Sequence, residues 1–452
     1  MRIKTDIPIR TDLVLNSKGI ISINSDIRAS AICTDSREAE KNDLYIPLRG
    51  ERFDGEDFLA EAMRRGAYTV SARDKNASIF VRDTREFMLS LAGKYKELIS
   101  PRMTVGVTGS VGKTTTKDLC AAILSRFFKV HATKDNLNND IGVSYTLFSM
   151  PRDTDILIVE AGMNHGGELS AISEALQPNV AAITNIGTSH IGNFGSRDAI
   201  AKAKLEILNS TSKPIAIVPY EEALLSKVNG RTVSLCSDRS SYYMRYDGSE
   251  NRASFFMNGT RLSEFEIKPK GTHIPKCLAF ALAAAVEVGA DTRYLCEAVE
   301  AVLDVPRATH ITGLLKFRII DDSYNASYES IVAALKTLTE ETGRKVAVIG
   351  DVMELGDRAG DIHFSIGKAC AEYGISLLFT FGEYASKIAE GALAAGFKKE
   401  NVYVNSDPRN PYETARTIVS HCRCDDIILF KASHRTGMHR IIKAIEQIVE
   451  EI

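Results

Sequence analysis

The sequence predicts an α/β fold built from three domains, and three observations support this. The chain has 452 residues, and at about 100 to 200 residues per domain the expected number is three. Apolar runs of strand length alternate with segments of helical periodicity, which is typical of parallel sheets covered by helices. Two breaks in this alternation, near residues 101 and 306, divide the chain into three parts.

The strongest strand signals are short apolar runs bounded by polar or glycine residues. A helix is expected at the end of the chain, where apolar residues recur at helical spacing and form one core-packing stripe. The expected strands are 103–109, 156–162, 180–187, 345–352, 377–382 and 427–432, and the stripe consists of Met438, Ile441, Ile442, Ile445, Val449 and Ile452.

Both domain boundaries follow predicted helices. The helical segment 85–100 ends at Pro101, and a proline stops a helix at the residue before it. The second boundary is expected at Val305-Pro306-Arg307, after helices near 276–288 and 295–303. The expected domains are therefore 1–101, which ends in a linker helix, 102–306 and 307–452.

Composition excludes several classes of protein. The 56 basic and 58 acidic side chains nearly cancel, so neither a nucleic-acid groove nor an anionic membrane surface is expected. The N-terminus lacks the apolar segment of a signal peptide, and no run approaches the roughly 18 apolar residues of a membrane span. Eight scattered cysteines form neither a disulfide scaffold nor paired zinc ligands. We expect a cytoplasmic protein without membrane insertion.

The segment from Thr108 to Thr116 has the features of a phosphate-binding loop, because it follows a predicted strand and opens a predicted helix. In such loops glycines let backbone N–H groups close around phosphate oxygens, while a lysine meets the β- and γ-phosphates and a hydroxyl binds Mg²⁺. Val107 stands where the usual pattern has its first glycine, so a glycine-rich turn without function is the alternative. The candidate nucleotide-binding residues are Gly109, Ser110, Gly112, Lys113, Thr114 and Thr115.

Polar residues end the next two predicted strands. Glu160 closes one of them, and the carboxyl ends of parallel strands border the ligand crevice of such sheets. A carboxylate beside phosphates is a natural ligand of Mg²⁺. His190 follows the other strand, where a structural histidine is an equally good interpretation.

Several motifs in combination resemble the Mur ligase family over nearly the whole chain. They are TGSVGKTTTKD (108–118), NLNNDIG (136–142), VEAGMNHGGE (159–168), TNIGTSHIGNFGS (184–196) and IAKAKLEI (200–207). The most similar member joins D-alanyl-D-alanine to UDP-N-acetylmuramoyl-tripeptide. The resemblance implies a small α/β substrate-binding domain, a central P-loop ATPase domain with a parallel sheet, and a C-terminal Rossmann-like α/β domain that binds the incoming amine.

The resemblance also implies ATP, two Mg²⁺ sites and a lysine carbamylated by CO₂, whose negative charge bridges the second metal. That lysine corresponds to Lys204, with Lys202 as the other register; from the residues alone, both are solvated helix lysines. The implied metal ligands are Thr114, Glu160, His190 and Lys204, and the implied catalytic residues are Lys113, Glu160, His190 and Lys204.

Substrate-binding residues are implied at both ends of the chain. The block CTDSR (33–37), with DLYIPLRG (43–50) and FDGEDF (53–58), is similar to the segment that holds the UDP end of the substrate; a surface loop with a turn at Asp54-Gly55 is the alternative. In DDSYNASYES (321–330), the first two residues are implied to contact ATP, while Tyr324, Asn325 and later loops are implied to place the second substrate. The implied ATP contacts are Arg307, Asp321 and Asp322, and the implied substrate contacts are Ser36, Arg37, Asn138, Asn139, Tyr324 and Asn325.

The chain departs from the family pattern at a few positions, namely Ser144, Cys277, Ala308, Ser327 and Tyr328. The expected reaction is amide-bond formation through an acyl-phosphate, with a UDP-linked muramoyl peptide and D-alanyl-D-alanine as partners. The sequence does not identify the base for the amine, and His363 is one candidate. The alternatives are a divergent Mur-type ligase for another carboxylate and a non-catalytic P-loop ATPase. A monomer is expected.

Overall fold

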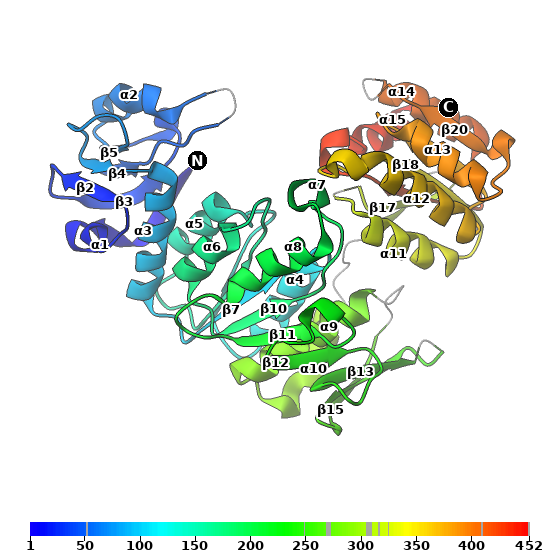
Figure 1. Ribbon diagram of the computed structural model, residues 1–452, viewed down its shortest axis with the longest axis horizontal. Coiled ribbons are helices and arrows are strands. Elements are labelled where there is room, and N and C mark those ends of the chain that lie inside the picture. The colour runs from blue at the N-terminus through cyan, green and yellow to red at the C-terminus, as the bar shows by residue number, and fades with distance from the viewer. Residues whose placement is uncertain are drawn as a thin grey trace.

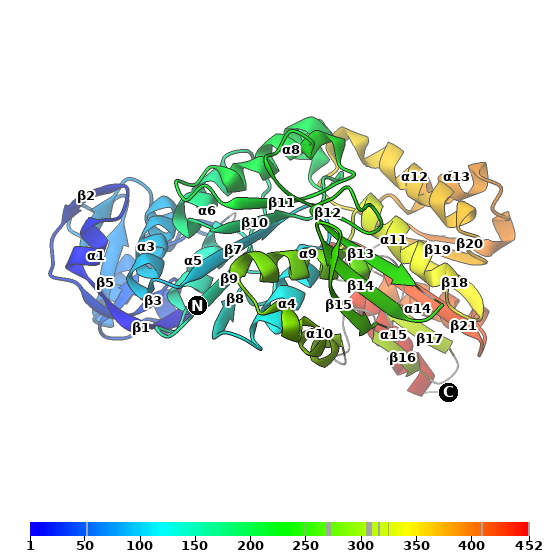
Figure 2. The same ribbon diagram turned by 90° about the horizontal axis from the view of Figure 1, so that it is seen from below.

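The computed structural model of the protein describes residues 1–50, 53–247, 249–267, 273–303, 310–314, 317–323, 325–407 and 410–450. Its strands form three sheets. Figures 1 and 2 show three lobes in a row, with the N-terminal lobe in blue, the central lobe in cyan to green and the C-terminal lobe in yellow to red. The predicted α/β class and three-part architecture are confirmed.

The first sheet is mixed, with the strand order β1-β3-β4-β5-β6-β2. Its inner strands pair in parallel, while β1 and β2 pair antiparallel at the edges. The elements are β1 (Arg2–Arg10), α1 (Thr11–Leu15), β2 (Ile20–Ile23), β3 (Arg28–Cys33), β4 (Asp43–Tyr45), α2 (Leu59–Arg64), β5 (Tyr68–Ser71) and β6 (Ile79–Val81).

Helix α3 (Thr84–Ile99) joins the first lobe to the second and confirms the helix predicted at 85–100. The carboxylate of Asp83 accepts hydrogen bonds from the first free N–H groups of this helix, those of Arg85 and Glu86, which is the preferred way to begin a helix. The helix ends before Pro101, as expected from the missing N–H of proline.

The second sheet is the largest, with the order β15-β14-β13-β12-β11-β10-β7-β9-β8. Its strands run parallel from β8 to β13, and β14 and β15 add an antiparallel hairpin. The strands are β7 (Met103–Thr108), β8 (Val130–Ala132), β9 (Ile156–Glu160), β10 (Val180–Ile183), β11 (Ile215–Pro219), β12 (Gly230–Ser234), β13 (Tyr242–Asp247), β14 (Arg252–Met257) and β15 (Thr260–Glu266).

Helices cover both faces of this sheet. Successive side chains of a strand point to opposite faces, so apolar strands like these need a helical layer on each side. On β9, Ile156 and Ile158 pack in the cluster of α4 and α9, whereas Leu157 and Val159 pack in the cluster of α3, α5 and α6. The helices are α4 (Lys113–Leu124), α5 (Asp140–Phe148), α6 (Glu168–Leu176), α7 (Ile191–Phe194), α8 (Arg197–Leu205), α9 (His273–Val288) and α10 (Leu295–Leu303).

The third sheet has the order β16-β17-β21-β18-β19-β20 and is parallel except for the edge strand β16. The predicted apolar stripe is confirmed from Met438 to Val449, since Met438, Ile441 and Ile445 are buried in the core of this lobe; Ile452 lies outside the described residues. The elements are β16 (His310–Leu314), β17 (Phe317–Asp321), α11 (Tyr328–Thr339), β18 (Arg344–Gly350), α12 (Ala359–Glu372), β19 (Leu377–Phe381), α13 (Ala385–Ala394), β20 (Val402–Asn405), α14 (Pro411–His421), β21 (Asp426–Lys431) and α15 (His439–Glu450).

All six strands predicted from apolar runs are present, as β7, β9, β10, β18, β19 and β21. The parallel neighbours β7, β9 and β10 end at Thr108, Glu160 and Ile183 along one edge of the second sheet. Ligands of open parallel sheets bind at this edge. Among the described residues, no helix has the length and apolar content required to cross a bilayer.

Candidate functional site

The loop after β7 has the backbone that the phosphate-loop prediction requires. Gly109 and Gly112 have φ values of 148° and 81°, in a region that side chains other than glycine rarely adopt. A side chain at Gly109 would also collide with the hydroxyl of Thr184. Helix α4 begins directly after the loop, at Lys113, so its free N–H groups and its dipole are directed at the loop.

The segment that follows β10 supports the phosphate loop from the side. Asn185 Oδ1 accepts hydrogen bonds from the backbone N–H groups of Ser110 (2.9 Å) and Val111 (2.8 Å). The Thr184 hydroxyl donates to the carbonyl of Val111 at 2.6 Å, and the N–H of Gly187 donates to Ser110 Oγ at 2.8 Å. Asn185 was not among the residues selected from the sequence, although its place just after a strand beside the loop was a usable signal.

Lys113 folds back over the same loop. Its ammonium donates to the carbonyl of Gly109 at 2.9 Å and to that of Ser110 at 3.4 Å. Burial lowers the pKa of Lys113, and the nearby negative charge of Glu160 opposes that shift. Lys113, which is expected to bind phosphate, therefore lies within electrostatic range of Glu160, which is expected to bind the metal.

Glu160 has one satisfied and one unsatisfied carboxylate oxygen. The residue is 1% exposed, and its Oε1 accepts a hydrogen bond from Asn138 Nδ2 at 2.7 Å. Its Oε2 is buried and has no hydrogen-bond partner among the described residues. A buried carboxylate oxygen without a partner is costly, and a divalent cation would satisfy it.

The two asparagines expected to hold substrate lie before helix α5 and have different roles. Asn138 orients Glu160, as described above. Asn139 is the N-cap of α5, and its Oδ1 accepts a hydrogen bond from the N–H of Gly142 at 2.8 Å.

Lys204 lies on α8 and is 2% exposed, whereas Lys202 is exposed. Burial and the positive charge of Lys113 keep the pKa of Lys204 well below its usual value. No hydrogen bond from its amine is found within the described parts of the chain. Burial disfavours the charged form of a lysine, so Lys204 fits the carbamylated lysine that the resemblance implies better than the exposed Lys202 does.

Thr114 and His190 complete the expected set of metal ligands. Thr114 is exposed in the first turn of α4 and Thr115 is half-buried. His190 precedes α7 with a φ of 63°, and its Nδ1 is hydrogen-bonded to the carboxylate of Glu354. Within the described residues no three His, Cys, Asp or Glu side chains gather into a metal cluster; the expected set instead depends on a hydroxyl and on a carbamate.

The N-terminal block presents one exposed and one occupied side chain. Arg37 forms two hydrogen bonds with the carboxylate of Asp35, at 2.9 and 2.6 Å, and its side chain is 80% exposed. These hydrogen bonds lower the pKa of Asp35 to about 2. Ser36 is buried, and its hydroxyl donates to Glu61 at 2.7 Å. Arg37 is therefore the more available of the two for a ligand.

The expected ATP contacts of the third lobe cluster at the end of β17. Asp321 accepts hydrogen bonds from the N–H and hydroxyl of Ser323, at 3.0 and 2.6 Å. Asp322 forms an ion pair with Lys431 at 2.7 Å, and Lys431 also donates to the carbonyl of Asn325 at 2.9 Å. No hydrogen bond or ion pair links Asp321 or Asp322 to the phosphate loop in the described structure. The predicted residues Arg307 and Tyr324, and the boundary at 305–307, lie outside the described residues.

The interpretation of His363 as a base is wrong. The residue is fully buried, its Nε2 accepts a hydrogen bond from the N–H of Val352 at 2.9 Å, and its Nδ1 donates to the carbonyl of Ala359 at 2.6 Å. Burial lowers its pKa. Nε2 thus ties α12 to the segment after β18, and Nδ1 is bonded within the first turn of α12, so both ring nitrogens are occupied.

Two departures from the family pattern have local structural roles. Cys277, on α9, packs under the phosphate loop with its sulfur 3.8 Å from the carbonyl of Gly112. Ser327 caps α11 in a reciprocal hydrogen-bonded arrangement with Ser330, the capping box that serine side chains commonly form at a helix start.

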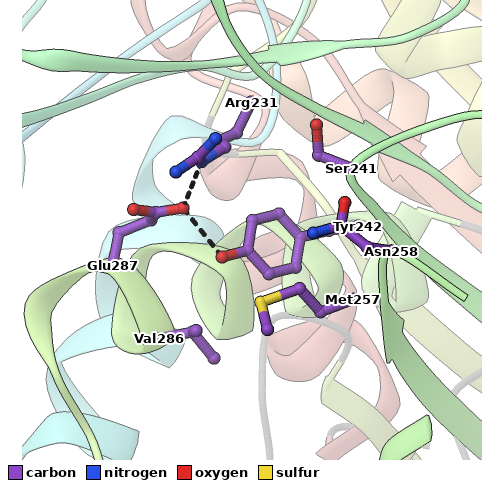
Figure 3. Close-up of a pocket in the computed structure, with 7 residues that line it drawn as sticks. All are labelled: Arg231, Ser241, Tyr242, Met257, Asn258, Val286 and Glu287. Atoms are coloured by element: carbon purple, nitrogen blue, oxygen red, sulfur yellow. Dashed lines mark hydrogen bonds and ion pairs between the residues drawn. The ribbon is translucent and has the colours of Figure 1, made fainter. Parts of the chain in front are cut away.

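A cavity of about 190 Å³ lies elsewhere, between β12, β13 and α9. Figure 3 shows Glu287 facing Arg231 and Tyr242, and its Oε1 accepts hydrogen bonds from both, at 2.7 and 2.8 Å. These bonds tie β12 and β13 to α9, and none of the predicted site residues lines the cavity.

Comparison with known proteins identifies relatives along nearly the whole chain. Residues 107–285 match the Mur ligase middle domain, and residues 307–434 match the Mur ligase, glutamate ligase domain. The chain is 35% identical over 434 residues to UDP-N-acetylmuramoyl-tripeptide–D-alanyl-D-alanine ligase of Bacillus subtilis (strain 168), across 91% of this chain and 92% of that protein. The protein of the same name from Synechocystis is 32% identical, across 97% and 96%. The crystal structure I of MurF from Acinetobacter baumannii is similar with a TM-score of 0.84 and 28% identity, across 97% of this chain and 99% of that chain.

Proposed function

The chain belongs to the Mur ligase family, and we propose that it joins the carboxylate of a UDP-N-acetylmuramoyl-tripeptide to the amine of D-alanyl-D-alanine at the expense of ATP. Relatives named for this activity align with it over more than nine-tenths of its length, at 35% and 32% identity. The reaction is a ligation that releases ADP and phosphate, and it belongs to the synthesis of peptidoglycan precursors.

The observation that carries this proposal is the position of Lys113 between two unusual buried groups. Its charge is within range of Glu160, whose Oε2 is unsatisfied among the described residues, and of Lys204, whose amine is buried without a hydrogen bond in the described structure. A P-loop ATPase without a ligation step requires neither a second buried lysine beside the loop nor a third lobe. The arrangement supports the ligase over that alternative.

The residues present fit Mg²⁺, since the orphaned oxygen of Glu160 offers a hard ligand beside the phosphate loop. Thr114, Glu160, His190 and a carbamate on Lys204 would hold two ions. When bound, Mg²⁺ would neutralise the negative charge shared by the γ-phosphate and the attacking carboxylate. The carbamate arises when the neutral Lys204 amine attacks CO₂ and loses a proton.

Two steps complete the reaction. First, a carboxylate oxygen of the tripeptide attacks the γ-phosphorus, the bond to ADP breaks, and an acyl-phosphate forms. The phosphate-loop N–H groups and Lys113 stabilise the charge that moves toward ADP in this step. Then the amine of D-alanyl-D-alanine attacks the acyl carbon, phosphate leaves and the amine loses a proton. Closure of the lobes would supply the proximity that this second step needs.

We propose separate positions for the three substrates. Arg37, with Ser36 after release from Glu61, would hold the UDP end, while Asn138 and Asn139 would contact the substrate nearer the reacting carboxylate. ATP would occupy the loop formed by Gly109, Ser110, Gly112, Lys113, Thr114 and Thr115, with Arg307, Asp321 and Asp322 approaching from the third lobe. Tyr324 and Asn325 would orient D-alanyl-D-alanine.

These roles correspond to three proposed domains: 1–101 for the UDP-substrate, 102–306 for ATP and 307–452 for the incoming amine. We further propose that the protein acts as a cytoplasmic monomer. Its substrates are a sugar nucleotide, ATP and a dipeptide, and each proposed contact to them comes from one copy of the chain.

The test is release of phosphate from ATP with each substrate omitted in turn. Phosphate release should require both the UDP-linked tripeptide and D-alanyl-D-alanine, and mass spectrometry should detect the joined product. If ATP is hydrolysed equally fast with and without the two substrates, the protein would instead be a non-ligating ATPase. Turnover only with a different carboxylate would support a divergent ligase of the same family.

A further inference from the structure

The loop that follows β10 in the second lobe contacts the third lobe directly. The N–H and hydroxyl of Thr188 donate to the two carboxylate oxygens of Glu329, at 2.7 and 3.1 Å. The N–H of Gly192 donates to the backbone carbonyl of Glu354 at 3.1 Å. A side chain at Gly192 would collide with the backbone at Gly356, so the two backbones meet as closely as a glycine permits.

Between these contacts lies the pair His190 and Glu354. Nδ1 of the imidazole is hydrogen-bonded to the carboxylate of Glu354 across 164 residues of sequence. Both residues have a φ of 63°, a left-handed conformation that costs energy for residues other than glycine. Two residues with strained backbones, on different lobes, are therefore joined through their side chains. One of the two, His190, is the proposed metal ligand.

The hydrogen bond to Glu354 decides which ring nitrogen of His190 carries the hydrogen. A carboxylate oxygen accepts hydrogen bonds, so Nδ1 of His190 is the donor. In neutral His190 this leaves the lone pair on Nε2, the form in which histidine binds metals.

We infer that Glu354 is a positioning residue for the metal centre, which holds the imidazole of His190 from the third lobe so that Nε2 is the ligating nitrogen. The inference rests on the proposed function, because it takes His190 as a ligand. Metal-bound histidines commonly donate their second N–H to a carboxylate, which fixes the ring and raises its basicity. Here that carboxylate comes from another lobe, so docking of the third lobe completes the metal site of the second.

The competing explanation is that Glu354 only docks the two lobes. Glu329 provides a matched control, since its carboxylate also bridges the lobes, through Thr188, without touching His190. Glu329→Ala removes a bridge of the same kind. Its partner in the second lobe, Thr188, lies two residues before His190 in the same loop.

The experiment measures Mn²⁺ binding to the full-length protein with ADP, by the electron paramagnetic resonance of free Mn²⁺. His190→Ala first establishes whether His190 binds the ion: loss of one Mn²⁺ site is expected, and no loss would reject the metal set of the proposed function. Glu354→Ala should weaken that same site by roughly 10- to 100-fold. Glu329→Ala should leave it unchanged.

Two further variants keep the outcome independent of folding. The Mn²⁺ site at Thr114 and Glu160 should persist in Glu354→Ala, which shows that the second lobe is intact, and Glu354→Gln should recover part of the affinity because its amide oxygen can still accept from Nδ1. His190→Ala with Glu354→Ala should bind no more weakly than His190→Ala alone. Equal losses in Glu354→Ala and Glu329→Ala, or an unchanged site in Glu354→Ala while His190→Ala loses it, would overturn the inference.

Discussion

The side-chain oxygen of Asn185 accepts a 2.8 Å hydrogen bond from the backbone N–H of Val111, inside the phosphate loop. The same oxygen accepts from the N–H of Ser110 at 2.9 Å. In loops of this kind these N–H groups bind phosphate oxygens. Asn185 thus occupies the backbone N–H groups that would otherwise bind the phosphates of ATP. It also connects the segment after β10, which contains His190, to the nucleotide-binding loop.

Asn185→Ala should therefore destabilise the protein without nucleotide by roughly 1 to 3 kcal/mol, since it removes the acceptor of the Val111 N–H and leaves the Ser110 N–H only the backbone carbonyl of residue 185, at 3.3 Å. Added MgADP supplies phosphate oxygens in its place, so nucleotide should raise the Tm of this variant more than that of the wild type. Asn179→Ala is the control, because Asn179 Oδ1 accepts from the N–H of Thr104 at 2.8 Å, at the other end of the same strands. An equal nucleotide-induced rise in Tm in all three proteins would contradict the prediction.

Lys113→Ala should lower kcat by about 100-fold or more while the protein stays folded. The change removes a positive charge directed at the transferring phosphoryl group, where preorganised charge contributes most to catalysis. Turnover and circular dichroism are measured together. Lys129→Met, which removes an exposed lysine paired with Asp153 on the same lobe, should leave kcat unchanged; a similar loss in both variants would refute the specific role of Lys113.

Lys204→Ala should be nearly inactive, and short carboxylates such as acetate should partly restore activity by placing an anion where the carbamate would be. Burial lowers the pKa of Lys204 and so favours the neutral amine, the form that reacts with CO₂. Removal of dissolved CO₂ should therefore slow the wild type. Lys202→Ala, two positions away and exposed, serves as the control. Inactivity in Lys202→Ala with full activity in Lys204→Ala would reverse the assignment.

Arg37→Ala should raise KM for the UDP-linked peptide by about tenfold to a hundredfold, the effect of losing one charge-assisted contact. KM for ATP should stay nearly constant, because Arg37 lies on the first lobe and the phosphate loop on the second. A modest fall in kcat is compatible with remote binding energy that positions the carboxylate. Steady-state kinetics decide the point: a raised KM for ATP alone would reject the UDP role of the first lobe.

The fold followed from local sequence wherever the pattern was strong. The strands that form the centres of the second and third sheets are continuous apolar runs, as expected for strands buried on both faces. The hairpin of β14 and β15 was not among the predicted elements, although Asn258 and Gly259, with φ values of 49° and 82°, form the Asn-Gly signal of a tight turn.

The site was predictable only where its residues share a motif. Lys113, Thr114 and Glu160 follow strands that the sequence reveals, so their approach to one sheet edge could be inferred. Glu354, in contrast, reaches His190 from 164 residues away, and no local pattern specifies that meeting. His363 looked available as a base because sequence cannot show that both its ring nitrogens are already bonded.

The central claim, ligation through an acyl-phosphate, is tested most directly by following oxygen from the carboxylate. A UDP-N-acetylmuramoyl-tripeptide labelled with ¹⁸O in its terminal carboxylate is incubated with the enzyme, ATP and D-alanyl-D-alanine, and the released phosphate is analysed by mass spectrometry. The carboxylate attacks the γ-phosphorus, and the amine then displaces phosphate from the acyl carbon. This sequence predicts one ¹⁸O atom in each phosphate formed. Unlabelled phosphate, released while ATP is consumed, would mean that water and not the carboxylate attacks ATP, and it would contradict the account.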